Sequence, residues 1–237
     1  MPSLVWIHGF PLSSKIFAKQ PRGFAPDLAG FGSAPPPSRD YTMNDYAKDV
    51  LAGMDAQNID RAVLGGLSMG GYILMAIARI APERISGVIL IDTRETPDTA
   101  ESKKGRYDTI EKVKEKGVGV VVEPMLPKML TSGAPQPLVD ETRRIMMSSS
   151  SEGVIAALRA MAERSDSTDA LRKLNVPALV VAGDQDTITP LADAQRMGAL
   201  LPNATVVTIR GAAHLSNFEQ PEQFNDAVAS FLKRHDL

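Results

Sequence analysis

The sequence predicts an α/β fold, a doubly wound parallel sheet of about six strands with helices on both faces. The length of 237 residues suits one large domain. Short and nearly continuous apolar runs, such as LVWI, VILI and ALVVA, are typical of parallel strands that are covered on both faces. Stretches with helical periodicity separate most of these runs, and this alternation favours right-handed crossovers between parallel strands.

Six strands and four core helices can be placed along the chain. The segments with strand character are residues 3–7, 22–27, 62–67, 87–91, 178–182 and 205–209. The segments with helical character are residues 42–58, 69–80, 190–201 and 222–234. Thr42 stands three residues before Asp45, a spacing typical of a helix N-cap. We expect the 22–27 strand at one edge of the sheet, next to the first strand, because Arg22 and Pro26 suit an edge.

The region 95–174 breaks this alternation. It has little strand character and holds five helix candidates, at residues 103–116, 118–129, 136–149, 152–164 and 169–174. We therefore predict a helical cap inserted at residues 95–174, with a core domain made of residues 1–94 and 175–237. Methionines gather in the cap, either as ordinary helix core or as an adaptable apolar wall of a substrate pocket. The candidate pocket residues are Met125, Met129, Met146 and, from the C-terminal segment, Phe218.

Composition argues against several kinds of function. A net charge of −2 supplies no positive field to hold a nucleic acid. The chain has no cysteine and only three widely spaced histidines, so we expect no metal site, and the absence of a phosphate-binding loop leads us to expect no cofactor. No run reaches the roughly 18 apolar residues of a membrane helix, and the N-terminal segment has no basic n-region. We expect a cytoplasmic protein without a membrane partner.

The motif that carries chemistry is Gly-Leu-Ser-Met-Gly at residues 66–70, which matches the pattern G-x-S-x-G. It directly follows a predicted buried strand and directly precedes a predicted helix. A sharp strand-to-helix turn exposes the serine hydroxyl, and glycines flank it because side chains there would collide with neighbouring backbone. We predict that Ser68 is a nucleophile. The competing interpretation is a glycine-rich turn with an incidental serine.

A serine hydroxyl needs a base with a pKa near 7, and histidine is the natural choice. Only His214 stands downstream of the serine at the predicted carboxyl end of a strand, the edge where open α/β sheets place their active sites. We predict it as the base. An acid must then hold the imidazole in one tautomer. The strand ends offer Asp92, Asp184 and Asp186, and the residues alone do not decide among them.

Attack on a carbonyl group places negative charge on its oxygen, which calls for preorganised N–H donors. The N–H of Met69, directly after the serine, is the first expected donor. The loop HGFP at residues 8–11 supplies the second, since Gly9 allows close backbone approach and Phe10 retains its N–H. We expect the N–H of Phe10 in this role, and we expect His8 to stabilise the loop.

Five motifs, taken in order, resemble those of the α/β-hydrolase superfamily. They are HGFP at 8–11, APDLAGFG at 25–32, GLSMGG at 66–71, GDQDTITP at 183–190 and GAAHLSNFEQPEQF at 211–224. The chain looks most similar to small bacterial serine esterases and oxoadipate enol-lactonases. In that family's G-x-x-D-x-x-x-P pattern, the aspartate before x-x-x-P is the catalytic acid. The resemblance thereby assigns this role to Asp186 and leaves Asp184 in the loop, and it supports the roles given above to the serine, the histidine and the two N–H donors.

The chain departs from the family pattern at one point, its N-terminal strands. Family members usually begin with a pair of strands before the strand that leads into HGFP, and here that strand already begins at residue 3. We therefore expect the N-terminal strand pair to be missing and the sheet to contain six parallel strands.

These features together predict a serine hydrolase that cleaves carboxylic esters or lactones of small, partly apolar molecules through an acyl-enzyme intermediate. We expect a small-molecule substrate, no nucleic-acid partner, and a monomer or homodimer. Cofactor-free perhydrolysis and the hydrolysis of a C–C bond use the same side chains and stay open as alternatives. A ligand-binding receptor that keeps the side chains without activity is the alternative from another class of protein.

Overall fold

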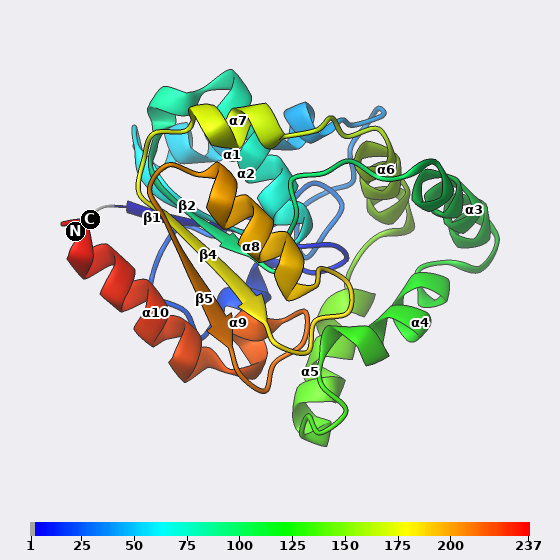
Figure 1. The fold of residues 1–237 in the computed structure, drawn as a ribbon. Coiled ribbons are helices and arrows are strands. Elements are labelled where there is room, and N and C mark those ends of the chain that lie inside the picture. Colours follow the sequence, from blue (N-terminus) through cyan, green and yellow to red (C-terminus); the bar gives the residue numbers. More distant parts are fainter. Residues whose placement is uncertain (1–2) are drawn as a thin grey trace.

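The computed structural model describes residues 3–237 and is built on one parallel sheet (Figure 1). Its strands are β1 (Ser3–Ile7), β2 (Ala62–Leu67), β3 (Ile85–Ile91), β4 (Ala178–Gly183) and β5 (Ala204–Ile209). The strands lie side by side in chain order, and every neighbouring pair is parallel. Parallel neighbours need crossover connections, and helices supply most of them. The predicted α/β class is confirmed.

The sheet has five strands, and the prediction of a sixth at residues 22–27 was wrong. This segment forms a single parallel bridge to β1. The N–H of Phe24 donates to the Leu4 carbonyl, and the Phe24 carbonyl accepts from the Trp6 N–H, both at 2.8 Å. The next donor along the ladder would be residue 26, and Pro26 has no N–H. The segment lies beside β1 as expected, but proline ends the pairing before a strand can form.

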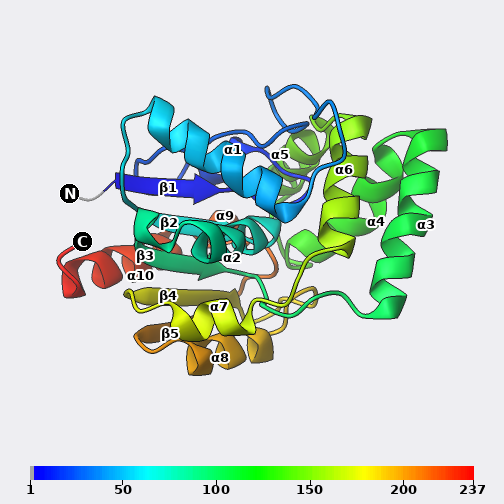
Figure 2. The same cartoon turned by 90° about the horizontal axis from the view of Figure 1, so that it is seen from above.

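Helices cover both faces of the sheet (Figures 1 and 2). One face carries α1 (Met43–Ala56), α2 (Met69–Ile80), α7 (Thr168–Lys173) and α8 (Leu191–Leu200), and the other carries α9 (Ser216–Glu219) and α10 (Pro221–Arg234). Alternate residues of each strand point to opposite faces. In β1, Val5 packs into the first apolar cluster and Trp6 into the second. The sheet therefore has two hydrophobic cores.

The α-helices agree with the sequence prediction to within three residues at each end, but the one-turn α9 and the short 3-10 helices Ser14–Phe17 and Pro82–Arg84 were not expected. At the start of α1, the Thr42 hydroxyl accepts from the Asp45 N–H at 3.3 Å, and the Asp45 carboxylate accepts from the Thr42 N–H at 2.9 Å. This reciprocal capping box explains why the helix begins there. No helix within residues 3–237 combines the length and the apolar character needed to cross a membrane.

Between β3 and β4 the chain leaves the sheet. The helices α3 (Ala100–Lys116), α4 (Gly119–Met129), α5 (Gln136–Met147) and α6 (Ser151–Ala162) lie beyond the ends toward which the strand arrows point (Figure 2). α3 packs against α4 and α6, and α4 packs against α5. These four helices thus stand over the carboxyl ends of the strands, where parallel α/β sheets place their functional residues.

Several contacts tie these helices and their connecting segments to the rest of the chain, among them hydrogen bonds of Ser150 and Leu215. The N–H and the hydroxyl of Ser150 both lie 3.0 Å from the Gly30 carbonyl oxygen, and the Leu215 N–H donates to the Met129 carbonyl at 3.0 Å. Gly30 has φ of +88°, and a Cβ there would come within 2.2 Å of the Gly153 Cα. Only glycine allows the start of α6 to approach this loop so closely.

Candidate active site

Ser68 stands on a sharp turn between β2 and α2. Its φ of 52° and ψ of −114° lie in a region that residues with a side chain rarely adopt. Neighbouring backbone holds the turn, since the Ser68 N–H donates to the Ile91 carbonyl at 2.9 Å and the Thr93 hydroxyl donates to the Ser68 carbonyl at 2.8 Å. A Cβ on Gly70 would lie 2.0 Å from the Ile7 carbonyl oxygen. Glycine is therefore required for this turn to pack against β1.

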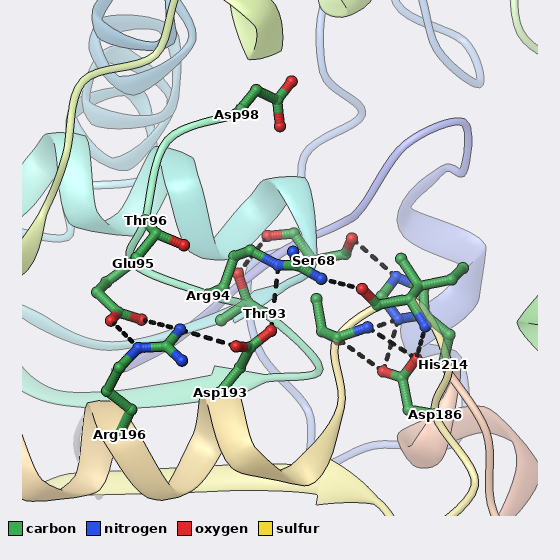
Figure 3. Close-up of polar contacts among 12 residues, drawn as sticks. Ser68, Thr93, Arg94, Glu95, Thr96, Asp98, Asp186, Asp193, Arg196 and His214 are labelled. Carbon is green, nitrogen blue, oxygen red and sulfur yellow. Dashed lines mark hydrogen bonds and ion pairs between the residues drawn. The ribbon is translucent and has the colours of Figure 1, made fainter. Parts of the chain in front are cut away.

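The Ser68 hydroxyl faces the imidazole of His214, and the Asp186 carboxylate contacts the other side of that ring (Figure 3). The Ser68 Oγ lies 2.9 Å from the His214 Nε2, and the His214 Nδ1 lies 2.8 Å from the Asp186 Oδ2. With its proton on Nδ1, the imidazole donates to the carboxylate and accepts from the serine hydroxyl. The structure thus joins three side chains from the ends of β2, β4 and β5 in one hydrogen-bonded series.

Asp186 is oriented by its own loop. Its Oδ1 accepts the N–H groups of Ile188 and Thr189 at 2.7 and 3.0 Å, and its Oδ2 accepts the Thr189 hydroxyl at 2.6 Å. Thr189 was not among the candidate site residues. The Ile188 N–H, two residues after the aspartate, is the ordinary partner of an Asx turn, and such a turn brings the residue at the third position close to the carboxylate, so the spacing D-x-x-T held a signal for this contact.

The three groups shift one another's proton affinities. Burial alone would raise the pKa of Asp186, but the charge and hydrogen bond of His214 and the bonds from Thr189 bring that pKa below its usual range. Burial alone would lower the pKa of His214, but the charge and hydrogen bond of Asp186, helped by the charge of Asp92, raise that pKa above the usual 6.5. The pair therefore favours an ionised carboxylate beside a strengthened base.

The other two candidate acids are bonded elsewhere. The exposed Asp184 accepts the N–H groups of Gly211 and Ala212 at 2.9 and 3.3 Å and stays in the loop. Asp92 is buried at the end of β3, and its carboxylate is bonded to backbone N–H groups and to a hydroxyl. Asp186 alone among the three contacts the imidazole. Within the described residues, no group of three or more His, Asp or Glu side chains is arranged to hold a metal ion.

Two backbone N–H groups near Ser68 are available to a ligand. Met69 is the first residue of α2, where an N–H has no partner within its own helix. Among the hydrogen bonds formed within residues 3–237, none has the N–H of Met69 or of Phe10 as its donor. A Cβ on Gly9 would lie 3.0 Å from the Leu67 carbonyl oxygen, so this glycine lets the Phe10 loop approach the serine turn.

His8 is a buried structural residue of this loop. Its Nδ1 donates to the Gly9 carbonyl at 2.9 Å, and its Nε2 accepts the Leu28 N–H at 3.0 Å. Burial lowers the pKa of His8 to about 4. The neutral ring thus joins two loops through both nitrogens, as expected for a loop-stabilising role.

A cavity of about 460 Å³ opens between the core and helices α3, α4 and α6, with Phe10 and Ile188 in its wall. Of the four candidate pocket residues, Met125 lines it, whereas Met129, Met146 and Phe218 do not. All three are 0% exposed and lie in the apolar cluster on the α9–α10 face of the sheet. These three residues are therefore part of the hydrophobic core.

The cavity wall is charged as well as apolar. Its charged side chains are four cations and one carboxylate, namely Arg94, Arg106, Lys128, Arg164 and Asp98. Asp98 is the counter-ion of two of the cations. Arg94 pairs with Asp193, with its Nε 3.2 Å from the Oδ2 (Figure 3). Lys128 forms no ion pair among residues 3–237. The wall therefore carries an excess of positive charge, which the sequence did not predict.

Known proteins resemble the chain over most of its length. Residues 4–227 match the model of the alpha/beta hydrolase family. The chain is 31% identical to 3-oxoadipate enol-lactonase 2 of Acinetobacter baylyi over 212 residues, which cover 88% of this chain and 77% of that protein.

Solved structures give the same result. A thermophilic esterase from Thermogutta terrifontis, determined with malate bound, superposes with a TM-score of 0.96 at 36% identity, covering 99% of this chain and 91% of that one. An enol-lactonase from Burkholderia xenovorans superposes with a TM-score of 0.89 at 26% identity, covering 98% and 91%. The resemblance drawn from the five sequence motifs is confirmed: the chain belongs to the alpha/beta hydrolase family and is similar within it to esterases and enol-lactonases.

Proposed function

We propose that the chain is a serine hydrolase that cleaves carboxylic esters or lactones through an acyl-enzyme on Ser68. The observation that carries this proposal is the hydrogen-bonded series Ser68–His214–Asp186, with distances of 2.9 and 2.8 Å, next to two N–H groups that have no hydrogen-bond partner among residues 3–237. Similarity to esterases and enol-lactonases supports the same class of reaction.

In the first half of the reaction, the Ser68 Oγ attacks the carbonyl carbon while its proton passes to the His214 Nε2. Asp186 holds the imidazole in the required tautomer and stabilises the imidazolium. The N–H groups of Phe10 and Met69 donate to the oxyanion that forms on the substrate. The tetrahedral intermediate then expels the alcohol oxygen, which takes the proton from Nε2, and the acyl group stays on Ser68.

In the second half, water attacks the acyl carbon and gives its proton to Nε2. A second tetrahedral intermediate uses the same two N–H donors. When the bond to the serine oxygen breaks, Ser68 recovers the proton and the carboxylic acid leaves. A lactone follows the same steps, with the alcohol and the acid on one product molecule.

Residues 95–174 act in this proposal as a cap, with residues 1–94 and 175–237 as the core domain. The position of α3–α6 over the strand ends and the cavity between these helices and the core support this division. A cavity of about 460 Å³ is in the range of small-molecule sites. The substrate would lie between the two parts, with its carbonyl at Ser68.

The test is covalent labelling of Ser68 by a fluorophosphonate, together with hydrolysis of p-nitrophenyl butyrate. We expect Ser68→Ala to lose labelling and to lose at least about 10³-fold in kcat, and the surface variant Ser230→Ala to behave as the unaltered chain. Activity of Ser68→Ala near that of the unaltered chain would reject the nucleophile. A chain that is not labelled would favour a silent receptor. Cleavage of a diketone or formation of a peracid without ester hydrolysis would favour the other reactions of the same side chains.

A substrate that carries a carboxylate is a narrower candidate, favoured by the excess of cations in the cavity wall. Lys128 has no counter-ion among the described residues, so it can meet an anionic group of the substrate without giving up another ion pair. The enol-lactonase relative, by its name, acts on a lactone derived from an oxo-acid.

This candidate is tested with two esters of equal length, monomethyl adipate and methyl hexanoate. We expect the acid-bearing ester to have the higher kcat/KM. Lys128→Met should reduce that preference by roughly two- to fivefold, the range of a partly solvated ion pair. The matched control is Lys112→Met, an exposed lysine of α3 outside the cavity wall. Equal rates on the two esters would reject the narrower candidate and leave ester hydrolysis in place.

A further inference from the structure

Asp92 is a buried carboxylate that the mechanism above does not use. It directly follows β3, is 1% exposed, and has φ of 43°, in the left-handed region that residues with a side chain avoid. Its Oδ1 accepts the Gly183 N–H at 2.9 Å, and its Oδ2 accepts the N–H and the hydroxyl of Ser216 at 3.0 and 2.6 Å. Every partner is a donor, so the contacts suit an ionised carboxylate.

The two partners of this carboxylate belong to the loops that carry the acid and the base. Gly183 ends β4 and begins the loop that holds Asp186. Ser216 stands two residues after His214 and is the first residue of α9. The two loops touch, since a Cβ on Gly183 would lie only 2.2 Å from the Ala213 carbonyl oxygen. One side chain at the end of β3 therefore fastens both loops.

The charged groups that act on Asp92 are those of the active site itself. They are Asp186 and His214, and no lysine or arginine within residues 3–237 forms an ion pair with Asp92. Burial, and then the charge of Asp186, raises the pKa of Asp92 to about 7, against the opposing effects of the charge of His214 and of the hydrogen bonds from the Ser216 hydroxyl and the Gly183 N–H. In return the charge of Asp92 raises the pKa of His214, while that of Arg94 acts in the opposite direction.

Resting on the proposed function, we propose that Asp92 is a positioning residue for the hydrolysis. Its carboxylate holds the Asp186 loop and the His214 loop together, and in its ionised form its negative charge stabilises the imidazolium that forms during acyl transfer. The residue touches neither the carbonyl group nor the attacking oxygen. It acts through His214, by its charge and by its hydrogen bonds to the two loops.

The test measures kcat, KM and the pH profile of fluorophosphonate labelling in Asp92→Asn. The amide keeps the size of the side chain but loses its charge, and its NH₂ group faces a donor where the carboxylate accepted. We expect kcat to fall roughly tenfold, the effect of losing one charge-assisted hydrogen bond, with KM unchanged. The rising limb of the pH profile should move to lower pH, because the imidazole loses a charge that strengthens it as a base.

Asp184→Asn is the matched control. Asp184 also joins the β4 loop to the loop before His214 through two N–H bonds, but it is exposed, so solvent screens its charge. We expect its kcat to stay within about twofold of the unaltered chain and its pH profile to be unchanged. The same displacement of the profile in both variants, or an undisplaced profile in Asp92→Asn, would overturn the proposal.

Ser216→Ala provides a second readout if Asp92→Asn does not fold. It removes only the hydroxyl donor at 2.6 Å and leaves Asp92 in place. We expect kcat to fall roughly threefold and the rising limb of the labelling pH profile to move to lower pH, as in Asp92→Asn, because the Asp92 carboxylate loses a donor that stabilises its charge. No change in either quantity would reject the role of Asp92. Absence of Ser68 labelling in the unaltered chain would reject the proposed function instead, so the two failures are distinguishable.

Discussion

The Ser68 hydroxyl lies 2.9 Å from the His214 Nε2 although 146 positions separate the two residues along the chain. Their strands are not neighbours, since β3 and β4 stand between β2 and β5. The loop after β5 must therefore cross the ends of two strands to bring the imidazole to the serine. Its contacts with Gly183 at the end of β4 and with Asp92 at the end of β3 hold it on that path.

Activity should rise with pH, and the midpoint of this rise should lie above pH 6.5, the pKa of an ordinary histidine. The base must be neutral to accept the serine proton, and the charge of Asp186 raises the pKa of His214 above 6.5 despite burial. Protonation therefore persists to a higher pH than in a free imidazole. Values of kcat/KM for p-nitrophenyl butyrate, measured from pH 5 to 9, check this. A flat profile, or a midpoint below pH 6.5, would contradict the assignment of His214.

Asp186→Asn should lower kcat by about 10³- to 10⁴-fold, because an amide in this position favours the wrong imidazole tautomer and leaves the imidazolium without its counter-charge. KM should change little, since the carboxylate does not face the cavity. Steady-state kinetics with the same ester provide the measurement, and near-ultraviolet circular dichroism checks that the variant is folded. A loss below about tenfold would show that Asp186 is not the acid.

Gly70→Ala should destabilise the fold and slow the labelling of Ser68. The new Cβ would lie 2.0 Å from the Ile7 carbonyl oxygen, so the turn must move, at a cost of roughly 1–3 kcal/mol in the free energy of unfolding. Gly105→Ala is the matched control within a helix. No atom lies within 4 Å of the Cβ it would add, and alanine should stabilise α3 by about 0.5–1 kcal/mol. Urea unfolding of both variants checks the pair, and similar effects would contradict the packing argument.

His8 should make the fold sensitive to acid. Its pKa is about 4 in the folded chain, lowered by burial, and about 6.5 when the chain unfolds. The unfolded state therefore binds more protons between these pH values, and stability falls as pH falls through this window. The loss in the free energy of unfolding caused by His8 reaches about 3 kcal/mol when pH has dropped below both pKa values.

The measurement is the free energy of unfolding from urea titrations at pH 7 and pH 5. His8→Gln removes the titrating ring, so the loss of stability between the two pH values should shrink. His235→Gln, at the end of α10, is the control and should leave that loss unchanged. An equal loss in His8→Gln and the unaltered chain would show that His8 does not account for the acid sensitivity.

Local patterns in the sequence were enough to predict the elements that depend on short windows of the chain. Five of six strands, the helix bounds and the turn at Ser68 follow from apolar runs, periodicity and glycine placement within short windows. The motif order pointed to the family, and the chain belongs to it.

Features that depend on the paths of loops and on packing between distant segments could be identified only from the folded chain. The residues left three aspartates open, and only the path of the loop after β4 puts Asp186, at 2.8 Å, against the imidazole and leaves Asp92 to fasten two loops. Apolar character could not separate Met125 in the cavity wall from Met129 in the core, because both lie on the same helix and only its neighbours differ. Hydrophobicity predicts that a side chain is buried, because burial of apolar surface is favourable but non-directional. Which residues the side chain contacts depends on how the whole chain packs.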